Sequence, residues 1–492
     1  MSPRLRLLFV ICALAACVPL WSVKYLPMTD LPQHAAQIYL WQHLADPDVA
    51  RTYEINWFTP YVAGYALTRA LADHTGIRIA LKLVITLAVL AFPLSLAYLF
   101  RKAGRDPAWA LLGFPLAFGY NFYWGFLNFL VAIPVGIALL GAIIGYGEAP
   151  TPRGAALLAI GACALFFGHV LVMLVIVASG GLWLVLRAPR LLTGFLSALP
   201  LAAPFPIALF WATLTRSADT QVRGMTMLAG PPPVLRLIGL PGILLGEASD
   251  AAALATGAAL LLLLVLAMRL SRELHRYAPL AVCLALYTVG PHRAFGTYYL
   301  YGRFAVLVMP ALILAWEPLK RPRLTPTATA TALVLIALSW TAVLTTRFTR
   351  FDAEARDFDR IAEKIPAGAS LLSLCWSQES PHIPGHFPFL HFPAWHQADH
   401  GGLLGFSFAT FFPEMLRYRE NQAPPMTVDL HWLPDTFNWN VDGSYDCYVV
   451  RADNATIPTV FLSRPLERIA QAGKYSLWLN RARVRPRSAI LR

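Results

Sequence analysis

Long apolar runs alternate with short polar connections over about the first 350 residues of the chain. A helix needs about 20 predominantly apolar residues to cross the hydrocarbon core of a bilayer. About eleven runs approach or reach that length, near residues 7–23, 77–100, 107–120, 126–146, 154–168, 170–187, 191–213, 251–268, 277–290, 304–318 and 326–345. We therefore expect an α-helical polytopic membrane protein with about 11 transmembrane helices.

The pattern changes after about residue 350, where charged residues, Pro and His become more frequent and no further run of spanning length occurs. Residues 369–375 read as a strand, whereas 466–472 have a helical pattern that leads into a strand-like 475–479. These features predict a small α/β module.

The predicted division is a transmembrane domain over 1–349 and a soluble α/β domain over 350–492. The first long connection, residues 24–76, is a loop of the transmembrane domain.

Composition and charge support this class and indicate an orientation. The chain has 492 residues, of which 57% are hydrophobic and only 14% charged, and its mean hydropathy is +0.54. Such values exclude an ordinary soluble protein. The net charge of +13 could indicate nucleic acid, but the basic residues lie in short connections. Counted along the eleven runs, these basic clusters all fall on one side: Arg4/Arg6, Arg101-Lys102/Arg105, Arg153, Arg187/Arg190, Arg269/Arg272/Arg276 and Lys320-Arg321/Arg323.

Basic connections mark the cytoplasmic side of a membrane protein. The N-terminus is therefore expected in the cytoplasm, and an odd number of crossings puts the C-terminal domain outside. The expected partner is the lipid bilayer and not nucleic acid. An alternative interpretation of the N-terminus, a lipoprotein signal ending at Cys17, is less favoured because the apolar run continues through Trp21.

With this topology, groups capable of acid–base chemistry or anion binding collect on the external side. The first external loop begins with Thr29-Asp30-Leu31-Pro32-Gln33-His34. From Leu31 to Leu44 the apolar positions follow helical spacing, which predicts an amphipathic helix on the membrane surface. Asp30 precedes this helix and His34 lies one turn later, so the two share a face. The alternative is that Asp30 is only the helix N-cap and His34 a surface residue.

Other external connections carry cations and aromatic side chains. His169 lies between the fifth and sixth runs, and Arg223 in a longer loop. The loop before the tenth run, residues 291–303, contributes His292, Arg293, Tyr301 and Arg303. Arginine on the external face runs against the positive-inside bias, which makes these residues candidates for binding an anion. Arg303 also has a simpler interpretation as a side chain that reaches the headgroups.

The chain resembles the GT-C class of integral-membrane glycosyltransferases. The resemblance covers the whole architecture, but the motifs that carry it are confined to Thr29-Asp30-Leu31-Pro32-Gln33-His34 and, more weakly, to Tyr301-Gly302-Arg303-Phe304. It implies that the donor is a sugar on a polyprenyl phosphate and that Asp30 is the catalytic base or orients the acceptor. The Asp-Glu pair of the protein-mannosylating branch is missing, so the subfamily is not identified.

The physical demands of such a transfer fit the same residues. A base must take the proton of the acceptor hydroxyl, and Asp30 near the low-dielectric interface suits that task, with His34 beside it. A cation must stabilise the leaving phosphate, and guanidinium groups bind phosphate bidentately. Arg303, Arg293 and Arg223 are the candidates. His292, His169 and Tyr301 are the accompanying lipid-phosphate or substrate-binding residues.

Two further patterns suggest a metal, with simpler alternatives for each. Asp46-Pro47-Asp48 has the Asp-x-Asp form that some metal-dependent members of this class use, but an acidic loop produces it by chance as well. A second candidate is the histidine-rich segment His382, His386, His391, His396 and His400. Its prolines forbid a regular helix of ligands, so zinc binding, a loop folded over the membrane site and a plain structural loop remain open.

The external domain also contains Cys375 and Cys447 in strand-like contexts, and an oxidising exterior permits a bridge between them. The expected activity is sugar transfer at the external face of the bacterial inner membrane. Alternatives are a lipid-linked glycan transporter or flippase, an O-antigen ligase or polymerase-like enzyme, and a non-enzymatic scaffold with an external binding domain. A transporter would normally need polar groups at the midplane of its spans, which the runs nearly lack.

Overall fold

The computed structural model describes residues 2–218, 230–294, 297–320, 323–453, 461 and 464–483. Contacts divide the chain into two compact units. Unit 1 comprises Met1–Trp21, Phe58–Ala66 and Lys82–Thr345, and unit 2 comprises Ser22–Trp57, Leu67–Leu81 and Thr346–Arg492. By contacts, most of the first loop therefore belongs with the C-terminal segment. The predicted boundary at residue 349, which concerns the membrane, stays a prediction.

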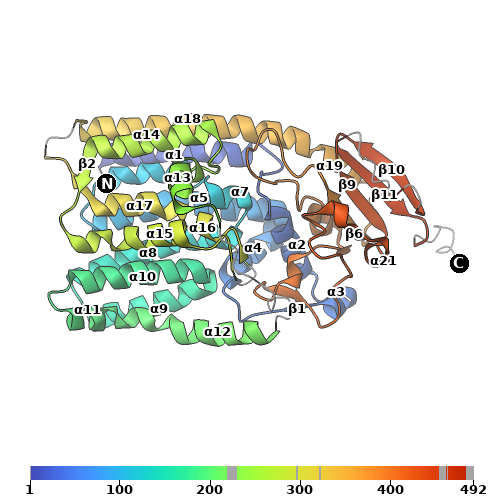
Figure 1. Ribbon diagram of the computed structural model, residues 1–492, viewed down its shortest axis with the longest axis horizontal. Helices are drawn as coiled ribbons and strands as arrows, with labels where there is room; N and C mark the ends of the chain where they lie inside the picture. The colour runs from blue at the N-terminus through green and yellow to red at the C-terminus, as the bar shows by residue number, and fades with distance from the viewer. Residues whose placement is uncertain are drawn as a thin grey trace. The chain divides into compact units, whose positions relative to one another are not determined.

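Unit 1 is built mainly of helices (Figure 1). Its longer helices are α1 (Pro3–Trp21), α4 (Val62–Thr75), α5 (Ile77–Lys102), α8 (Leu127–Glu148), α9 (Pro152–Gly168), α10 (Val170–Arg187), α12 (Pro204–Ala218), α14 (Ala251–Ala267) and α18 (Pro326–Ala355). Helices α4, α5 and α18 each lie partly in unit 2. The shorter ones are η1 (Pro107–Leu112), α6 (Gly113–Leu116), α7 (Tyr120–Trp124), α11 (Leu191–Ala198), η2 (Leu199–Ala202), α13 (Pro233–Ile243), η4 (Leu274–Tyr277), α15 (Ala278–Val289), α16 (Leu300–Arg303) and α17 (Ala305–Ala315).

Five helical segments of the described residues are long and apolar enough to cross a membrane, and a bent pair, Leu191–Ala202 with Pro204–Leu214, makes six. Shorter apolar helices of 10–17 residues accompany them. The expected helical, apolar class is therefore confirmed, whereas the count of eleven crossings stays a prediction. The third expected run, 107–120, contains only the short elements η1 and α6 before α7 begins.

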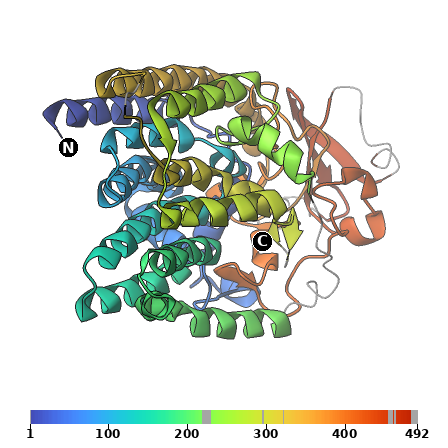
Figure 2. The ribbon, with the colours of Figure 1, turned by 60° about the vertical axis from the view of Figure 1, so that its left-hand side comes forward.

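Small residues let the helices of unit 1 approach closely, as Figure 2 shows for the ribbons packed side by side. Helix α10 packs against α8, α9, α11 and α15. A Cβ atom at Gly136 of α8 would lie 2.8 Å from Val172, and one at Gly180 of α10 would lie 2.6 Å from Ile143. Such small-residue contacts are typical of helices packed in a membrane, so Gly136 and Gly180 are packing glycines.

Two short antiparallel pairs complete unit 1. Strand β2 (Met268–Leu270) pairs with β5 (Trp316–Pro318), and β3 (Arg293–Ala294) pairs with β4 (Thr297–Tyr298). The second pair lies in the arginine-containing loop before α16.

Unit 2 contains a five-stranded sheet in the order β10-β11-β9-β6-β7. The strands are β6 (Ser370–Cys375), β7 (Leu403–Leu404), β9 (Cys447–Arg451), β10 (Leu466–Ala472) and β11 (Tyr475–Asn480). Strand β6 pairs in parallel with β9 and β7, and β11 pairs antiparallel with β9 and β10. The predicted α/β character and the strand at 369–375 agree with this arrangement.

The helix expected over 466–472 is wrong, because these residues form β10. Gly473 has φ +52°, a conformation that suits a tight hairpin turn. The turn brings β10 alongside β11, and the ladder of backbone hydrogen bonds along β11 outweighs the local helical preference of a segment rich in Ala, Glu and Arg.

The remaining elements of unit 2 are mostly short. They are α2 (Leu31–Gln42), α3 (Pro47–Thr52), β1 (Tyr53–Ile55), α19 (Asp357–Ala362), α20 (Ala394–His400), η5 (Phe408–Thr410), β8 (Leu416–Tyr418), η6 (Pro434–Thr436) and α21 (Trp439–Asp442). Strand β1 of the first loop pairs antiparallel with β8 of the C-terminal segment. Two stretches more than 350 residues apart are thus joined by a ladder that runs from Tyr53 opposite Tyr418 to Ile55 opposite Leu416.

Helix α2 begins at the predicted residue, but it is not an amphipathic surface helix. Its polar side chains Gln33, His34 and Gln37 are as buried as its apolar ones, with 2%, 5% and 2% exposure. The C-terminal segment covers the face that the sequence suggested would meet water, since α2 packs on α20, η5 and β8.

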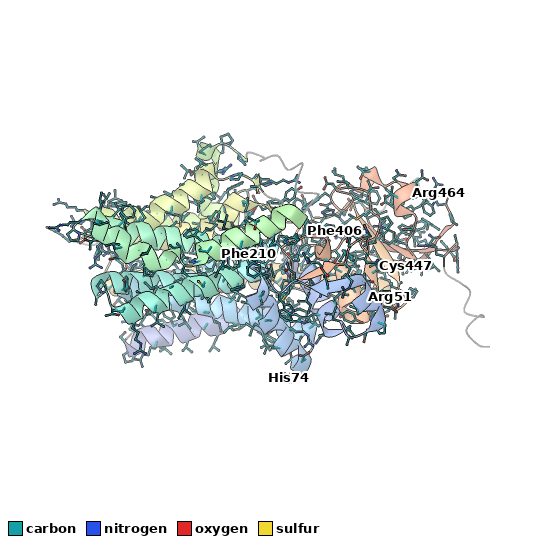
Figure 3. The ribbon with its side chains drawn as sticks, turned by 90° about the horizontal axis from the view of Figure 1, so that it is seen from below. Arg51, His74, Phe210, Phe406, Cys447 and Arg464 are labelled. Carbon is teal, nitrogen blue, oxygen red and sulfur yellow. The ribbon has the colours of Figure 1, made fainter. Side chains whose placement is uncertain are left out.

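A bridge between Cys375 and Cys447 is excluded. Both cysteines are free and buried, and Cys447 is labelled in Figure 3. In the parallel pairing of β6 with β9, Cys447 lies opposite Leu371 and Cys375 lies opposite Arg451. The two cysteines are therefore four positions apart along the strands, about 13 Å at the usual rise, whereas a disulfide needs Cα atoms within about 7 Å.

Two glycines of unit 2 with positive φ, Gly368 and Gly402, offer a test of this fold. Gly402 has φ +93°, and a Cβ atom there would lie 2.3 Å from the carbonyl oxygen of Ala369. Gly368 has φ +73° with nothing within 4 Å of its would-be Cβ. Gly368→Ala should cost about 1–2 kcal/mol of backbone strain, and Gly402→Ala about 1–3 kcal/mol more because of the clash. Thermal unfolding of the purified variants checks this, and equal losses would contradict the packing at Gly402.

Candidate functional site

Asp30 occupies the N-cap position of α2, with φ −90° and ψ −8°, and a proline stands in the first turn. Its backbone carbonyl accepts from His34 N at 3.1 Å. Its carboxylate does not cap the first turn of α2, whose residues are all described. The helix-cap interpretation therefore holds for the backbone of Asp30 and not for its side chain.

The carboxylate of Asp30 faces an imidazole from the C-terminal segment of unit 2. Nε2 of His391 lies 3.6 Å from Oδ1 of Asp30, and the two side chains are 5% and 16% exposed. His391 belongs to the histidine-rich segment, for which the sequence left three interpretations open. The geometry brings this one histidine of the segment to the first-loop carboxylate.

Aromatic rings hold His391 in place. Phe406, which is labelled in Figure 3, stacks on the His391 ring at 4.9 Å with an angle of 11° between the planes. Phe406 also stacks on His431 at 3.8 Å and 17°, and the rings of His391 and His431 stack on each other at 5.9 Å and 28°. Phe408 meets His391 edge-on at 5.7 Å and also meets His34 edge-on at 5.6 Å. We call His391, Phe406 and His431 the imidazole stack.

Side-chain amides of α2 fix the loop that carries this stack. Gln33 donates to Phe406 O at 3.1 Å and accepts from Phe408 N at 3.1 Å. One turn later, Gln37 accepts from Leu416 N at 3.2 Å. Buried backbone N–H and C=O groups need hydrogen-bond partners. The side-chain amides provide them for this loop, as a neighbouring strand would in a sheet.

A small cavity of about 20 Å³ adjoins the imidazole stack. Its polar lining comes from Gln33, Ser373, His391 and His431. A volume of this order holds about one water molecule, so the cavity is not large enough to accommodate a sugar as it stands.

The electrostatics of the stack favour neutral imidazoles. Burial lowers the pKa of His391 well below its usual range, and the nearby His431 and His34 lower it further. Burial also lowers the pKa of His431 to about 3. A neutral imidazole carries a single N–H, so one ring nitrogen of His391 can donate while the ring stays uncharged beside the carboxylate of Asp30.

The other first-loop candidates lie elsewhere in unit 2. His34 is buried on α2 and is not the surface residue of the simpler interpretation. Asp46 precedes α3 without a side-chain cap, and Asp48 pairs with Arg51 at 2.7 Å while remaining 95% exposed. Within the described ranges, no group of three or more His, Cys, Asp or Glu side chains could hold a metal ion.

In unit 1, Arg303 closes the short helix α16 and is buried, with 8% exposure. Its guanidinium lies over the ring of Phe126 at 3.6 Å and donates to Tyr298 O at 3.1 Å. The backbone carbonyl of Arg303 accepts from the side chain of Asn121 at 3.0 Å. The side chain is thus held inside the unit by packing and hydrogen bonds, which a headgroup-reaching arginine would not show.

The loop before α16 gathers the remaining candidates of that stretch. Arg293 lies over the ring of Tyr298 at 4.3 Å. His292 meets the rings of Tyr299 and Tyr301 at 4.9 Å and 6.1 Å. Tyr299 has φ +59°, which is rare for a bulky residue and often marks a functional segment.

Tyr299 is held in this conformation by stacking on Trp124 at 3.8 Å. Trp124 ends α7, a short aromatic helix between the third and fourth expected apolar runs. The structure therefore brings that helix and the arginine loop together.

His169 lies in the turn between α9 and α10, where its Nδ1 accepts from Leu171 N at 3.2 Å. Rings of Tyr61 and Phe129 surround it at 5.1 Å and 5.0 Å. Burial, and then the positive charge of Arg303, lower the pKa of His169 well below its usual range. The structure thus brings His169 within electrostatic reach of Arg303. Arg223 lies outside the described residues.

Sequence reasoning missed two ionisable residues of unit 1. Arg236 lies over the ring of Tyr301 at 3.9 Å and donates to the carbonyls of Pro231, Tyr287 and Gly290 at 2.7, 3.1 and 2.6 Å. Those bonds make it a structural arginine. Glu247 follows α13, and burial raises its pKa. Both lie next to an apolar run, a position at which sequence alone does not separate a packing residue from a site residue.

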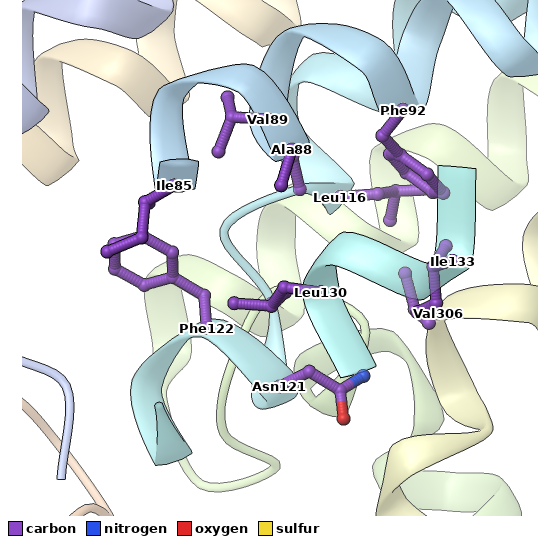
Figure 4. Close-up of a pocket in the computed structure, with 12 residues that line it drawn as sticks. Ile85, Ala88, Val89, Phe92, Leu116, Asn121, Phe122, Leu130, Ile133 and Val306 are labelled. Atoms are coloured by element: carbon purple, nitrogen blue, oxygen red, sulfur yellow. The ribbon is translucent and has the colours of Figure 1, made fainter. Parts of the chain in front are cut away.

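Figure 4 shows a second small cavity of about 20 Å³ in unit 1. Apolar side chains from α5, α8 and α17 dominate its wall, among them Val89, Leu130 and Val306. Asn121 is its amide-bearing residue, and the same amide donates to the carbonyl of Arg303. Asn121 therefore links the wall of this cavity to the backbone of Arg303, and the cavity itself holds no more than about one water molecule.

Comparison with solved structures identifies the fold. The crystal structure of ArnT from Cupriavidus metallidurans bound to undecaprenyl phosphate matches with a TM-score of 0.59 and 12% identity, over 99% of this chain and 100% of that one. The apo structure of the same protein matches with a TM-score of 0.56 and 13% identity, over 97% and 98% of the two chains. Protein-family models and curated proteins give no match. The resemblance to the GT-C class is confirmed at the level of the fold.

The imidazole stack predicts a pH dependence of stability. The unfolded chain protonates His431 near pH 6.5, whereas the folded chain does so only near pH 3. Stability is therefore lost as pH falls through this window, by about 2 kcal/mol at pH 5 from this group. His431→Phe keeps the stacking and removes the titration, so its unfolding temperature should fall by about 4–8 °C less than that of wild type between pH 7 and pH 5.

The control for this measurement is His400→Gln, since His400 is exposed on α20. It should retain the wild-type dependence on pH. An identical slope in wild type and His431→Phe would contradict a buried, neutral His431.

Proposed function

We propose that this protein is an integral-membrane glycosyltransferase that moves a sugar from a polyprenyl-phosphate donor to an acceptor hydroxyl. The observation that carries the proposal is the likeness to ArnT over nearly the full length of both chains, including the form bound to undecaprenyl phosphate. We propose that a half-buried carboxylate at the start of α2 and a buried arginine at the end of α16 supply the two charges that this reaction needs.

The proposed reaction is a single displacement. Asp30 takes the proton of the acceptor hydroxyl, whose oxygen forms a bond to the anomeric carbon of the sugar. The bond from that carbon to the phosphate oxygen breaks, and polyprenyl phosphate leaves with the electron pair. One displacement inverts the anomeric centre. The 16% exposure of the Asp30 side chain leaves an edge that an acceptor can reach.

Arg303 is the proposed ligand of the donor phosphate. A guanidinium stays charged in a buried setting and presents paired donors to phosphate oxygens. Stacking on Phe126 and the bond to Tyr298 O orient it before the lipid arrives. His292, Arg293, Tyr301 and His169 line the same region of unit 1 and are proposed to assist, as is Arg223 from outside the described residues.

The setting we propose is the bacterial inner membrane, with about eleven crossings, the N-terminus in the cytoplasm, and residues 350–492 on the extracytoplasmic side. The distribution of basic clusters supports this orientation. Lipid-linked sugars carry their phosphate at headgroup depth, so the acceptor is a molecule of the cell envelope.

Asp30→Asn tests the role of the carboxylate. Loss of a general base should lower the rate of transfer by about 10²–10⁴-fold, while binding of undecaprenyl phosphate should stay within twofold. The assay uses the purified full chain with radiolabelled hexoses and pentoses on undecaprenyl phosphate, and envelope lipids or water as acceptors. Asp429→Asn is the control, because Asp429 is exposed at φ +58°, which Asn tolerates. Wild-type activity in Asp30→Asn would remove this residue from the mechanism.

Arg303→Met tests the phosphate ligand. A lost charge-assisted contact of 1.5–3 kcal/mol should weaken binding of undecaprenyl phosphate by about 10- to 100-fold, as measured by native mass spectrometry in detergent. The exposed Arg190 gives the matched control Arg190→Met, which removes the same charge elsewhere in unit 1. If Arg303→Met bound the lipid as wild type does, another residue would hold the phosphate. A protein that moves the lipid-linked sugar across vesicles without transferring it would be a flippase.

A further inference from the structure

We propose that His391 is a positioning residue for Asp30, so that a carboxylate from the first loop and an imidazole from the C-terminal segment work as a pair. The inference rests on the proposed function and goes beyond it, because neither the glycosyltransferase fold nor the Asp30 motif calls for a histidine at this place. It stands on the 3.6 Å separation between His391 Nε2 and Asp30 Oδ1.

The surroundings of His391 leave its ring little freedom to turn. Phe406 covers one face at 4.9 Å, nearly parallel, and Phe408 approaches edge-on at 5.7 Å. The backbone carbonyl of His391 accepts from Ala394 N at 3.0 Å, just before α20 begins. A ring confined in this way keeps its Nε2 edge towards the carboxylate, which is what a positioning residue requires.

The separation fits a contact that tightens when substrate binds. At 3.6 Å the two atoms are about half an ångström beyond a hydrogen bond. Catalytic hydrogen bonds are often long before the substrate is present and shorten in the reactive complex. His391 would donate its N–H to Oδ1 of Asp30, and the carboxylate oriented in this way would take the proton of the acceptor hydroxyl.

In this scheme His391 keeps its proton throughout. The acceptor proton goes to Asp30, the anomeric carbon exchanges its phosphate oxygen for the acceptor oxygen, and the imidazole stays neutral. The titratable groups that face His391 are Asp30 before α2, His34 on α2 and His431, whose ring stacks on that of His391 at 5.9 Å. A positive charge on His34 or His431 would oppose protonation of His391. His391 therefore acts as a neutral hydrogen-bond donor.

Two substitutions separate the donor from the packing. His391→Phe keeps a flat ring in the imidazole stack and removes the N–H, whereas His391→Gln places an amide N–H near the position of Nε2. The assay measures sugar release from radiolabelled hexose- and pentose-charged undecaprenyl phosphate by the full chain between pH 4 and pH 9. A hydrogen-bond donor stabilises the charged form of a carboxylate. Loss of the donor should therefore raise the pH at which activity falls on the acid side of the profile, which we call the acid limb.

We expect His391→Phe to move the acid limb by about half to one pH unit and to lower kcat by about tenfold, with little change in KM. His391→Gln should restore both to near wild type, and His400→Gln is the unchanged control. An acid limb and kcat at wild-type values in His391→Phe, alongside an inactive Asp30→Asn, would overturn the pairing and leave the proposed function intact.

If none of the sugar donors reacts, that result counts against the proposed function. The pairing of His391 with Asp30 can still be tested by a measurement that does not depend on sugar transfer. Unfolding temperatures of Asp30→Asn, His391→Phe and the double variant form a cycle. If the side chains interact, the double variant should lose no more than the more damaging single variant. Losses that simply add would overturn the pairing.

Discussion

The site in unit 2 depends on the burial of α2, whose polar side chains are covered by the C-terminal segment. A helix that follows the first apolar run would ordinarily turn its polar face to water. Here Gln33 and Gln37 are 2% exposed, so their amides must find partners inside the protein, because an unpaired buried amide costs about 1–3 kcal/mol. The amide of Gln33 finds partners in the backbone of Phe406 and Phe408, and the amide oxygen of Gln37 finds Leu416 N, whereas Nε2 of Gln37 has no partner among the described residues. This requirement fixes the C-terminal segment on the first loop and brings His391 to Asp30.

Buried arginines of unit 1 illustrate how hydrogen-bond partners distinguish a structural role from a candidate functional one. Arg236 donates to three backbone carbonyls and stacks on Tyr301. Arg303 is oriented by Phe126 and Tyr298 and lies in electrostatic reach of His169. Both are equally hidden from solvent. Arg303 is therefore the candidate functional arginine of the two, and its backbone carbonyl accepts from Asn121, which lines the small apolar cavity of unit 1.

More of the fold than of the candidate site could be predicted from the sequence. Apolar runs located most of the longer helices of unit 1, but not α4 or α13, since burial in lipid demands an uninterrupted apolar stretch whatever the tertiary arrangement. Strand β6 and the start of α2 were also predictable, from alternation and from Asp30 with a proline in the following turn. Residues 466–472 were mistaken for a helix, because their preference is local and weak, whereas their pairing with β11 is not visible until the hairpin closes.

What the sequence by itself determined is the apolar, helical class of the protein, the resemblance to GT-C glycosyltransferases, and Asp30 as the first-loop carboxylate. These follow from composition and local order, which need no knowledge of distant residues. Only the tertiary structure decided that His34 is buried, that Cys375 and Cys447 stay apart, and that His391 faces Asp30. Each of these depends on a contact between segments separated by tens to hundreds of residues, and the register of such contacts is set by packing and by the need to satisfy buried polar groups.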